Sequence, residues 1–209
     1  MLLRELTLDQ FTEALASAAA TPGGGSASAL SGALAASLLA MVARNTAANP
    51  SFADRASALE EIATGAERLR EELIALVDED AAAFERVMAA FRLPKETPAL
   101  KEARSRQIQA AYREAVEPPL LVCQHALRVL ALAGRAAPLG NPNAVSDVGV
   151  AALLAASALD GAALNVEINL GSIKDETYRA ESTNTVQDAR SEGGKLRDEA
   201  LAKVRERLR

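Results

Sequence analysis

The segment from Ala27 to Ala43 consists almost entirely of small and apolar residues, and it directly follows three consecutive glycines, Gly23, Gly24 and Gly25. Small side chains fill little volume, so a helix built from them must approach its neighbours closely to form a packed core. Glycines ahead of a helix also let a ligand come close to the backbone. The N–H groups in the first turn of the helix are unpaired, so they can bind that ligand. We therefore expect this loop, with Ser26, to bind a ligand; the alternative is a tight turn between packed helices.

Helical signals continue along the chain. Thr7 and Gln10 have the spacing of a capping box, which predicts a first helix. The small-residue segment predicts a second helix over about 26–46, and an apolar stripe predicts a long helix over roughly 52–91. The pair Thr97-Pro98 then has the residue types of a helix start, with the threonine as cap.

The second half of the chain is interrupted by proline and glycine. Pro118-Pro119 predicts that the helix ends or kinks there, because a proline lacks a donor and clashes with the preceding turn. Ser146 is expected to cap a helix over about 147–170. The charged segment 174–209 predicts an exposed helix, or a helical hairpin interrupted near Gly193-Gly194. No strand pattern is present, so we expect one all-α domain over 1–209, a bundle of long antiparallel helices.

Composition excludes several classes of protein. A net charge of −5 and a single cysteine, Cys123, argue against nucleic-acid binding and against an intrachain disulfide. The first ten residues carry acids and no signal-peptide pattern, so a cytoplasmic location is expected. Serines and Gly32 interrupt the segment 27–43, which favours a buried helix over a membrane span. His125 is the only histidine, so no metal site is expected.

Two charged residues lie where they can take part in chemistry. Asp80 lies three residues after Val77 and four before Phe84, which turns it toward the apolar stripe of the long helix. A carboxylate held there would have a perturbed pKa and exchange protons; the alternative is a solvated helix face. Lys95 follows the end of that helix, where it can meet a ligand carboxylate or pair with the last helix carbonyls.

Polar residues also lie at both ends of the helix expected over 147–170. Asn143 and Asp147 are found at its start, where capping alone would explain them. Asn165 and Asn169 share one face at its end, and buried amides need partners. Asp147 and Asn165 are about 27 Å apart along a straight helix, so only a second chain or a long ligand can join the two clusters.

These motifs occur in an order that resembles the formiminotransferase-cyclodeaminase C-terminal family of cyclodeaminases and methenyltetrahydrofolate cyclohydrolases. The resemblance covers about residues 6–200, and the formiminotransferase half is absent, so the chain is similar to stand-alone bacterial members. The motifs that carry it are Thr21-Pro22-Gly23-Gly24-Gly25-Ser26, Asp80 with Phe84, Phe91-Arg92-Leu93-Pro94-Lys95, Asn143-Ala144-Val145-Ser146-Asp147-Val148-Gly149 and Asn165-Val166-Glu167-Ile168-Asn169-Leu170.

The resemblance implies an all-α homodimer that acts on a reduced folate with a tail of one or more glutamates, with no cofactor beyond this tetrahydrofolate substrate. Cyclodeamination of 5-formiminotetrahydrofolate to 5,10-methenyltetrahydrofolate and ammonia is our first interpretation. Hydrolysis of the methenyl form is the alternative, and a non-catalytic folate-binding or scaffolding protein is the alternative from another class. Asp80, Lys95 and Asp147 are then the expected catalytic residues. The expected substrate-binding residues are Gly23, Gly24, Gly25, Ser26, Asn143, Asn165 and Asn169.

Overall fold

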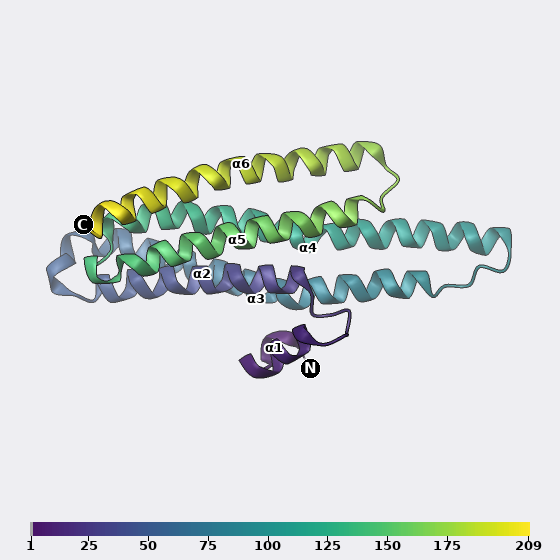
Figure 1. Ribbon diagram of the computed structural model, residues 1–209, viewed down its shortest axis with the longest axis horizontal. Coiled ribbons are helices and arrows are strands. Elements are labelled where there is room, and N and C mark those ends of the chain that lie inside the picture. Colours follow the sequence, from purple (N-terminus) through teal and green to yellow (C-terminus); the bar gives the residue numbers. More distant parts are fainter. Residues whose placement is uncertain (1) are drawn as a thin grey trace.

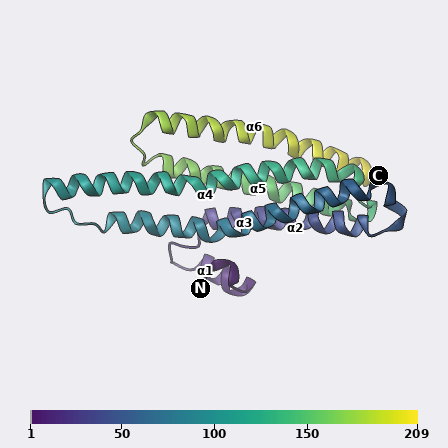
Figure 2. The ribbon, with the colours of Figure 1, turned by 180° about the vertical axis from the view of Figure 1, so that it is seen from behind.

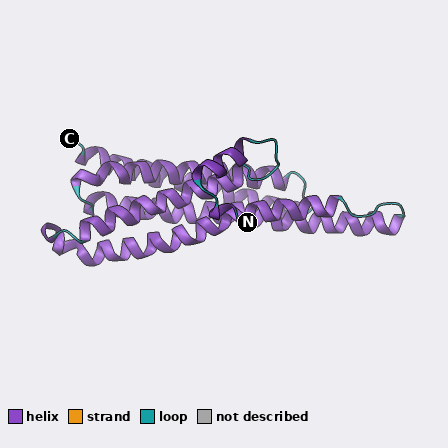
Figure 3. Cartoon of the chain, turned by 90° about the horizontal axis from the view of Figure 1, so that it is seen from below, coloured by secondary structure: helices purple, strands orange, loops and turns teal. Residues whose placement is uncertain are grey.

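The computed structural model describes residues 2–209, and it consists of helices joined by short connections (Figure 1). The α-helices are α1 (Leu8–Ala16), α2 (Gly24–Ala47), α3 (Ala56–Phe91), α4 (Pro98–Leu139), α5 (Val145–Leu170) and α6 (Glu176–Arg207). Three short 3-10 helices lie between them, at Leu3–Glu5, Pro50–Arg55 and Pro142–Ala144. Figure 3 shows no strand among these residues, so the prediction of an all-α fold is confirmed.

Helices α2 to α5 form an antiparallel four-helix bundle, and α6 packs against both α4 and α5 (Figures 1 and 2). The pairing of α2 with α5 closes the bundle. Helices α3 and α4 extend together beyond the end of α5, so that their connection forms the tip of a projecting arm (Figure 1). The short α1 lies to one side of the long helices.

The core is built from small residues at close approach. Helix α2 buries Ala29, Ala35, Ala36 and Ala43 completely. A Cβ on Gly32 would lie 3.0 Å from Leu73 of α3, which is tighter than nearly all real Cβ contacts. The small-residue segment therefore forms the closely packed helix that the sequence predicted, because only small side chains let helix backbones approach so closely.

Helix α4 is continuous through Pro118 and Pro119, so of the two predicted alternatives, an end or a kink, an end of the helix at these prolines is wrong. Each proline removes one backbone donor and leaves the carbonyl four residues earlier without its helical partner. The carbonyl of buried Ala115 instead accepts from the Asn169 side chain of α5 at 2.8 Å. Tertiary contacts thus replace the lost helical bond and allow the helix to continue.

Helix α6 is also continuous, so the hairpin alternative and the interruption at Gly193-Gly194 are wrong. Gly193 lies where α6 crosses α5, and a Cβ there would come within 2.7 Å of Leu159. The glycine therefore serves a close helix–helix contact. Its cost to helix propensity, about 1 kcal/mol relative to alanine, is offset by this packing.

The predicted helix starts are confirmed in two cases and shifted in two. Thr7 and Gln10 form the reciprocal capping box, and Thr97 accepts from the N–H of Leu100 at 3.2 Å. Ser146 lies inside α5 rather than at its cap, because the 3-10 turn before it already brings the chain into helical geometry. The long helix begins at Ala56 instead of residue 52, after a similar 3-10 segment.

By length and composition α2, α4 and α5 are each apolar enough to cross a membrane. In the bundle, 61% of the most apolar window of α2 is buried, as is half of the corresponding windows of α4 and α5. Much of their apolar surface therefore packs against the other helices.

Candidate active site

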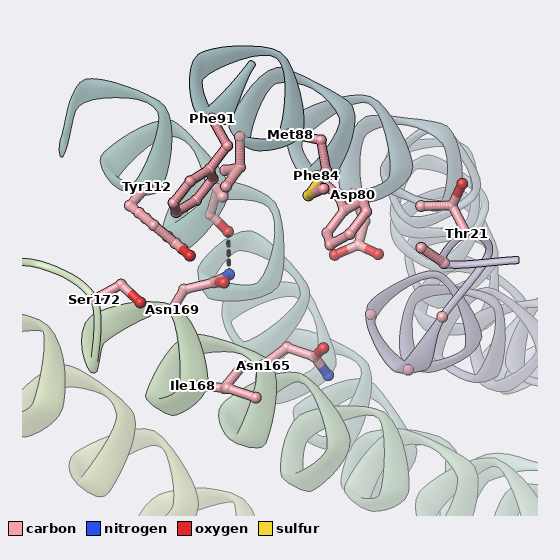
Figure 4. Close-up of a pocket in the computed structure, with 16 residues that line it drawn as sticks. Thr21, Asp80, Phe84, Met88, Phe91, Tyr112, Asn165, Ile168, Asn169 and Ser172 are labelled. Carbon is pink, nitrogen blue, oxygen red and sulfur yellow. Dashed lines mark hydrogen bonds between the residues drawn. The ribbon is translucent and has the colours of Figure 1, made fainter. Parts of the chain in front are cut away.

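One cavity of about 370 Å³ lies between the start of α2, the second half of α3, the middle of α4 and the end of α5 (Figure 4). Its wall combines backbone, a carboxylate, amides and aromatic rings. The lining residues are Ala20, Thr21, Gly23, Gly24, Gly25, Asp80, Phe84, Val87, Met88, Phe91, Tyr112, Ala115, Asn165, Ile168, Asn169 and Ser172.

The glycines form the first turn of α2 rather than a separate loop. Gly23 is the cap residue, and Gly24 and Gly25 are already helical. A Cβ on Gly25 would lie 2.0 Å from Oδ1 of Asp80, and a Cβ on Gly24 would lie 3.4 Å from the Asn165 amide. Any larger residue at position 25 would displace the carboxylate, so the absence of a side chain there is what allows Asp80 to lie against the helix start.

Asp80 is mostly withdrawn from water and held by Ser26. The Ser26 hydroxyl lies 2.9 Å from the Val77 carbonyl and 3.2 Å from Oδ2 of Asp80, so its one proton can serve either acceptor. Burial raises the pKa of Asp80, and hydrogen bonds from the Ser26 side chain and backbone partly oppose this rise. A carboxyl with a raised pKa that borders a cavity is suited to take up and release a proton.

Two asparagines of α5 face Asp80 across the cavity. The Nδ2 group of Asn165 donates to the Gly161 carbonyl at 2.8 Å, and that of Asn169 donates to the Ala115 carbonyl. These bonds fix the orientation of both amide groups. Their carbonyl oxygens are therefore available to accept hydrogen bonds from a ligand (Figure 4).

The remaining wall is apolar and aromatic. Phe84, Met88 and Phe91 follow Asp80 along α3, and Phe91 meets Tyr112 of α4 edge-to-face at 6.2 Å between ring centroids. Met88, Tyr112 and Ser172 were not among the site residues predicted from the sequence. The positions four, eight and eleven residues after Asp80 share its helix face, and this spacing was the available signal for the α3 residues.

The structure brings together part of the predicted site. Gly23, Gly24, Gly25, Asp80, Asn165 and Asn169 line the cavity, and Ser26 lies behind Asp80. Lys95 is exposed in the connection at the tip of the arm. Asn143 and Asp147 lie at the start of α5, toward the opposite end of the bundle (Figure 1). Within one chain these last three residues are outside the cavity, and their roles stay predictions.

The two groups most suited to metal or thiol chemistry are buried elsewhere. His125 is 9% exposed, its Nδ1 lies 3.5 Å from Glu72, and burial lowers its pKa. Burial raises the pKa of Cys123 to about 12, so its thiol is protonated at neutral pH. Among residues 2–209 no three His, Cys, Asp or Glu side chains are grouped closely enough to hold a metal ion.

A helical bundle with a partly buried carboxyl, oriented amides and an aromatic wall in one cavity is suited to an enzyme that acts on a planar, polar small molecule. The profile of the family described as Formiminotransferase-cyclodeaminase matches residues 7–188. The chain therefore belongs to this family of folate one-carbon enzymes.

Similar proteins cover both stand-alone and bifunctional members. The chain is 36% identical to a methenyltetrahydrofolate cyclohydrolase of Methylorubrum extorquens over 97% of each chain. It is 33% identical to the formimidoyltransferase-cyclodeaminase of Gallus gallus over 86% of this chain, and spans 33% of that longer protein. The crystal structure of a formiminotetrahydrofolate cyclodeaminase from Thermotoga maritima superposes with a TM-score of 0.87, at 27% identity and 98% coverage of both chains.

Proposed function

We propose that this chain opens the one-carbon bridge of 5,10-methenyltetrahydrofolate by hydrolysis, giving 10-formyltetrahydrofolate. The relative from Methylorubrum extorquens, similar over 97% of both chains, carries the name of this activity. Closure of 5-formiminotetrahydrofolate with release of ammonia is the second candidate. The names of the vertebrate relatives and of the Thermotoga maritima structure favour it.

The observation that carries the proposal is the partly buried Asp80, with its raised pKa, in one cavity with the amides of Asn165 and Asn169. In hydrolysis, the oxygen of a water molecule bonds to the bridging carbon while the Asp80 carboxylate takes a proton from that water. The new carbon–oxygen bond neutralises the positive charge of the bridge. The protonated Asp80 then donates to N5 as the carbon–N5 bond breaks, and the added hydroxyl loses its proton as the formyl C=O forms. One proton is released overall, and a raised pKa suits both transfers.

The same group serves the second candidate reaction. The formimino group reacts in its protonated, amidinium form. N10 attacks its carbon and passes its proton to the Asp80 carboxylate, and the protonated Asp80 then donates that proton to the NH2 group, which departs as ammonia and leaves the methenyl cation. Both reactions pass through a tetrahedral carbon between N5 and N10. The aromatic wall of Phe84, Phe91 and Tyr112 offers apolar surface for the ring system in either case.

The anionic glutamate tail is proposed to leave the cavity past Ser172. A shallow cleft on the far side of this segment is lined by Arg106, Arg113 and Lys174. Arg106 and Arg113 already pair with the carboxylates of Glu102 and Asp175. Lys174 contacts the Ser105 hydroxyl at 3.4 Å and pairs with no carboxylate in the described residues, so its ammonium is the cation best placed to meet a tail carboxylate.

The homodimer is part of the proposal, and an exposed apolar face supports it. Large apolar side chains from two adjacent helices, α2 and α5, are exposed together: Leu34, Met41, Val150, Leu153, Leu164 and Ile168. Such a face is typical of a surface that a second copy covers. Ser157 lies eleven residues after Ser146 and eleven residues before Ile168. If the α5 helices of two subunits pack antiparallel about a two-fold axis near Ser157, Ser146 of each subunit lies opposite Ile168 of the other. Asp147 of the partner subunit would then lie beside Asn169 and complete the site.

Purified protein offered each substrate tests the proposal, with methenyl absorbance and ammonia as the two readouts. Loss of absorbance without ammonia supports the hydrolase. Gain of absorbance with ammonia supports the cyclodeaminase. Binding of either folate without turnover would instead identify a folate-binding protein. We expect no cofactor requirement, so activity after exhaustive chelation should be unchanged, and we expect a cytoplasmic location.

A further inference from the structure

Three prolines lie inside α4, and two of the carbonyls they free are bonded by side chains of other helices. Pro119 frees the carbonyl of Ala115, and Pro138 frees that of Gly134. The first accepts from Asn169 of α5 at 2.8 Å, and the second accepts from Lys203 of α6 at 3.1 Å. The carbonyls of Ala115 and Gly134 thus each accept from a side chain of a neighbouring helix.

At Ala115 such a donor is required by burial. Ala115 is 6% exposed, and a buried carbonyl without a donor costs roughly 1–3 kcal/mol. The Asn169 amide is the side-chain donor that the structure places on this oxygen.

The bond also decides which atom Asn169 offers to the cavity. The amide group is planar, and a nitrogen held on the Ala115 carbonyl leaves Oδ1 on the other side of the group. Asn165 is oriented in the same way by the Gly161 carbonyl. Together with the Asp80 carboxylate, these oxygens place hydrogen-bond acceptors on the α3 and α5 sides of the cavity (Figure 4).

We propose that Pro119 is a positioning residue for substrate recognition. It leaves the Ala115 carbonyl in need of a donor, and this need keeps Oδ1 of Asn169 presented to an N–H group of the substrate ring. The inference rests on the proposed folate substrate, whose pterin carries an amino group and ring N–H donors along its edge. A ring of the same shape with acceptors at that edge would be rejected, because it would leave these oxygens unpaired.

The variant Pro119→Ala tests the inference. It restores the N–H that a helical Ala115 carbonyl accepts, so that carbonyl no longer depends on the Asn169 amide for a donor, and the amide is less firmly held in its present orientation. We expect KM for the folate substrate to rise about threefold to tenfold, the value of one hydrogen bond, with kcat changed by less than about twofold. Pro118→Ala is the matched control, because Pro118 is also buried, whereas the carbonyl it frees belongs to the exposed Glu114.

A double-mutant cycle separates positioning from a merely structural role. Asn169→Ala should raise KM by the same factor as Pro119→Ala, and the double variant should be no worse than Asn169→Ala alone. Independent, multiplying effects would overturn the inference, as would a wild-type KM for Pro119→Ala or an equal rise for Pro118→Ala. The two failures are distinguishable. If the wild-type protein converts neither folate, the proposed function is wrong. If the wild-type protein converts a folate but the variants behave as just described, only the inference about Pro119 is wrong.

Discussion

Asparagine and aspartate gather at both ends of α5, and the two clusters differ in what surrounds them. At the end of α5, Asn165 and Asn169 face Asp80 of α3 across a partly open cavity, and all three side chains are partly buried. At the start, Asn143 is exposed and Asp147 is half-exposed in the first turn, where a carboxylate complements the helix dipole. The same side-chain chemistry thus becomes a candidate site only where a second and third helix remove it from water.

The largest effect is expected at the cavity end. Asp80→Asn preserves the shape of the side chain and removes its proton transfer, so kcat should fall about 10²-fold to 10⁴-fold in the assay with the preferred folate. Glu79→Gln on the exposed side of α3 is the control and should retain wild-type turnover. A variant Asp80→Asn with wild-type kcat would remove the acid–base assignment.

The glycine turn beside Asp80 is the next test of the cavity. Gly25→Ala places a Cβ where Oδ1 of Asp80 now lies, 2.0 Å from the ideal position. The carboxyl must move by about an ångström, which we expect to lower kcat/KM about a hundredfold. Gly194→Ala is the control, because a Cβ there meets nothing within 4 Å. Equal activity of both variants would show that Asp80 needs no such close approach.

A smaller effect is expected at the other end of α5. If Asp147 of the partner subunit completes the cavity, Asp147→Asn should lower kcat/KM about tenfold, the value of one contact to a charged group. An unchanged kcat/KM would restrict the site to one chain. The exchange Leu153→Asp on the exposed apolar face should then yield a monomer by sedimentation, with the same loss of activity.

Mixing the two damaged proteins makes this comparison sharper. Dimers that combine one Asp80→Asn chain with one Asp147→Asn chain have one doubly altered site and one intact site. An equal mixture that exchanges subunits freely should regain about a quarter of wild-type activity, since half of the dimers are mixed and half of their sites are intact. Recovery no greater than the mean of the separate variants would contradict the shared site.

The smallest effect concerns stability. The pKa of Asp80 is raised in the folded state, so the folded chain holds this proton more tightly than the unfolded chain. The stabilisation from this proton is complete at low pH and is lost as pH rises through the folded pKa. Asp80→Asn should therefore raise the free energy of unfolding at neutral pH. This gain in stability should shrink as the pH falls toward 3.8, the ordinary pKa of aspartate. Urea titrations at several pH values measure this, and a loss of stability at every pH would contradict it.

The sequence was sufficient for the fold class and for several of the residues that line the candidate cavity. Glycines before a small-residue helix, Asp80 beside an apolar stripe and the pair Asn165 and Asn169 all depend on helical periodicity, which spacing reveals. Tyr112 and Ser172 were not found, because the first faces the cavity from α4 and the second follows the end of α5. Which residues of different helices face each other depends on packing that no local pattern records.

Local patterns determined that this chain is a helical bundle, where α1 and α4 begin and which side chains share a face, since these follow from 3.6 residues per turn and from caps a few residues long. Only the tertiary structure decided that α4 continues through Pro118-Pro119 and that α6 continues through Gly193-Gly194. In both places the local preference for a break is outweighed by a contact from a distant segment. Asn169 supplies the donor that Pro119 lacks, and the bare backbone of Gly193 lets α6 lie against Leu159.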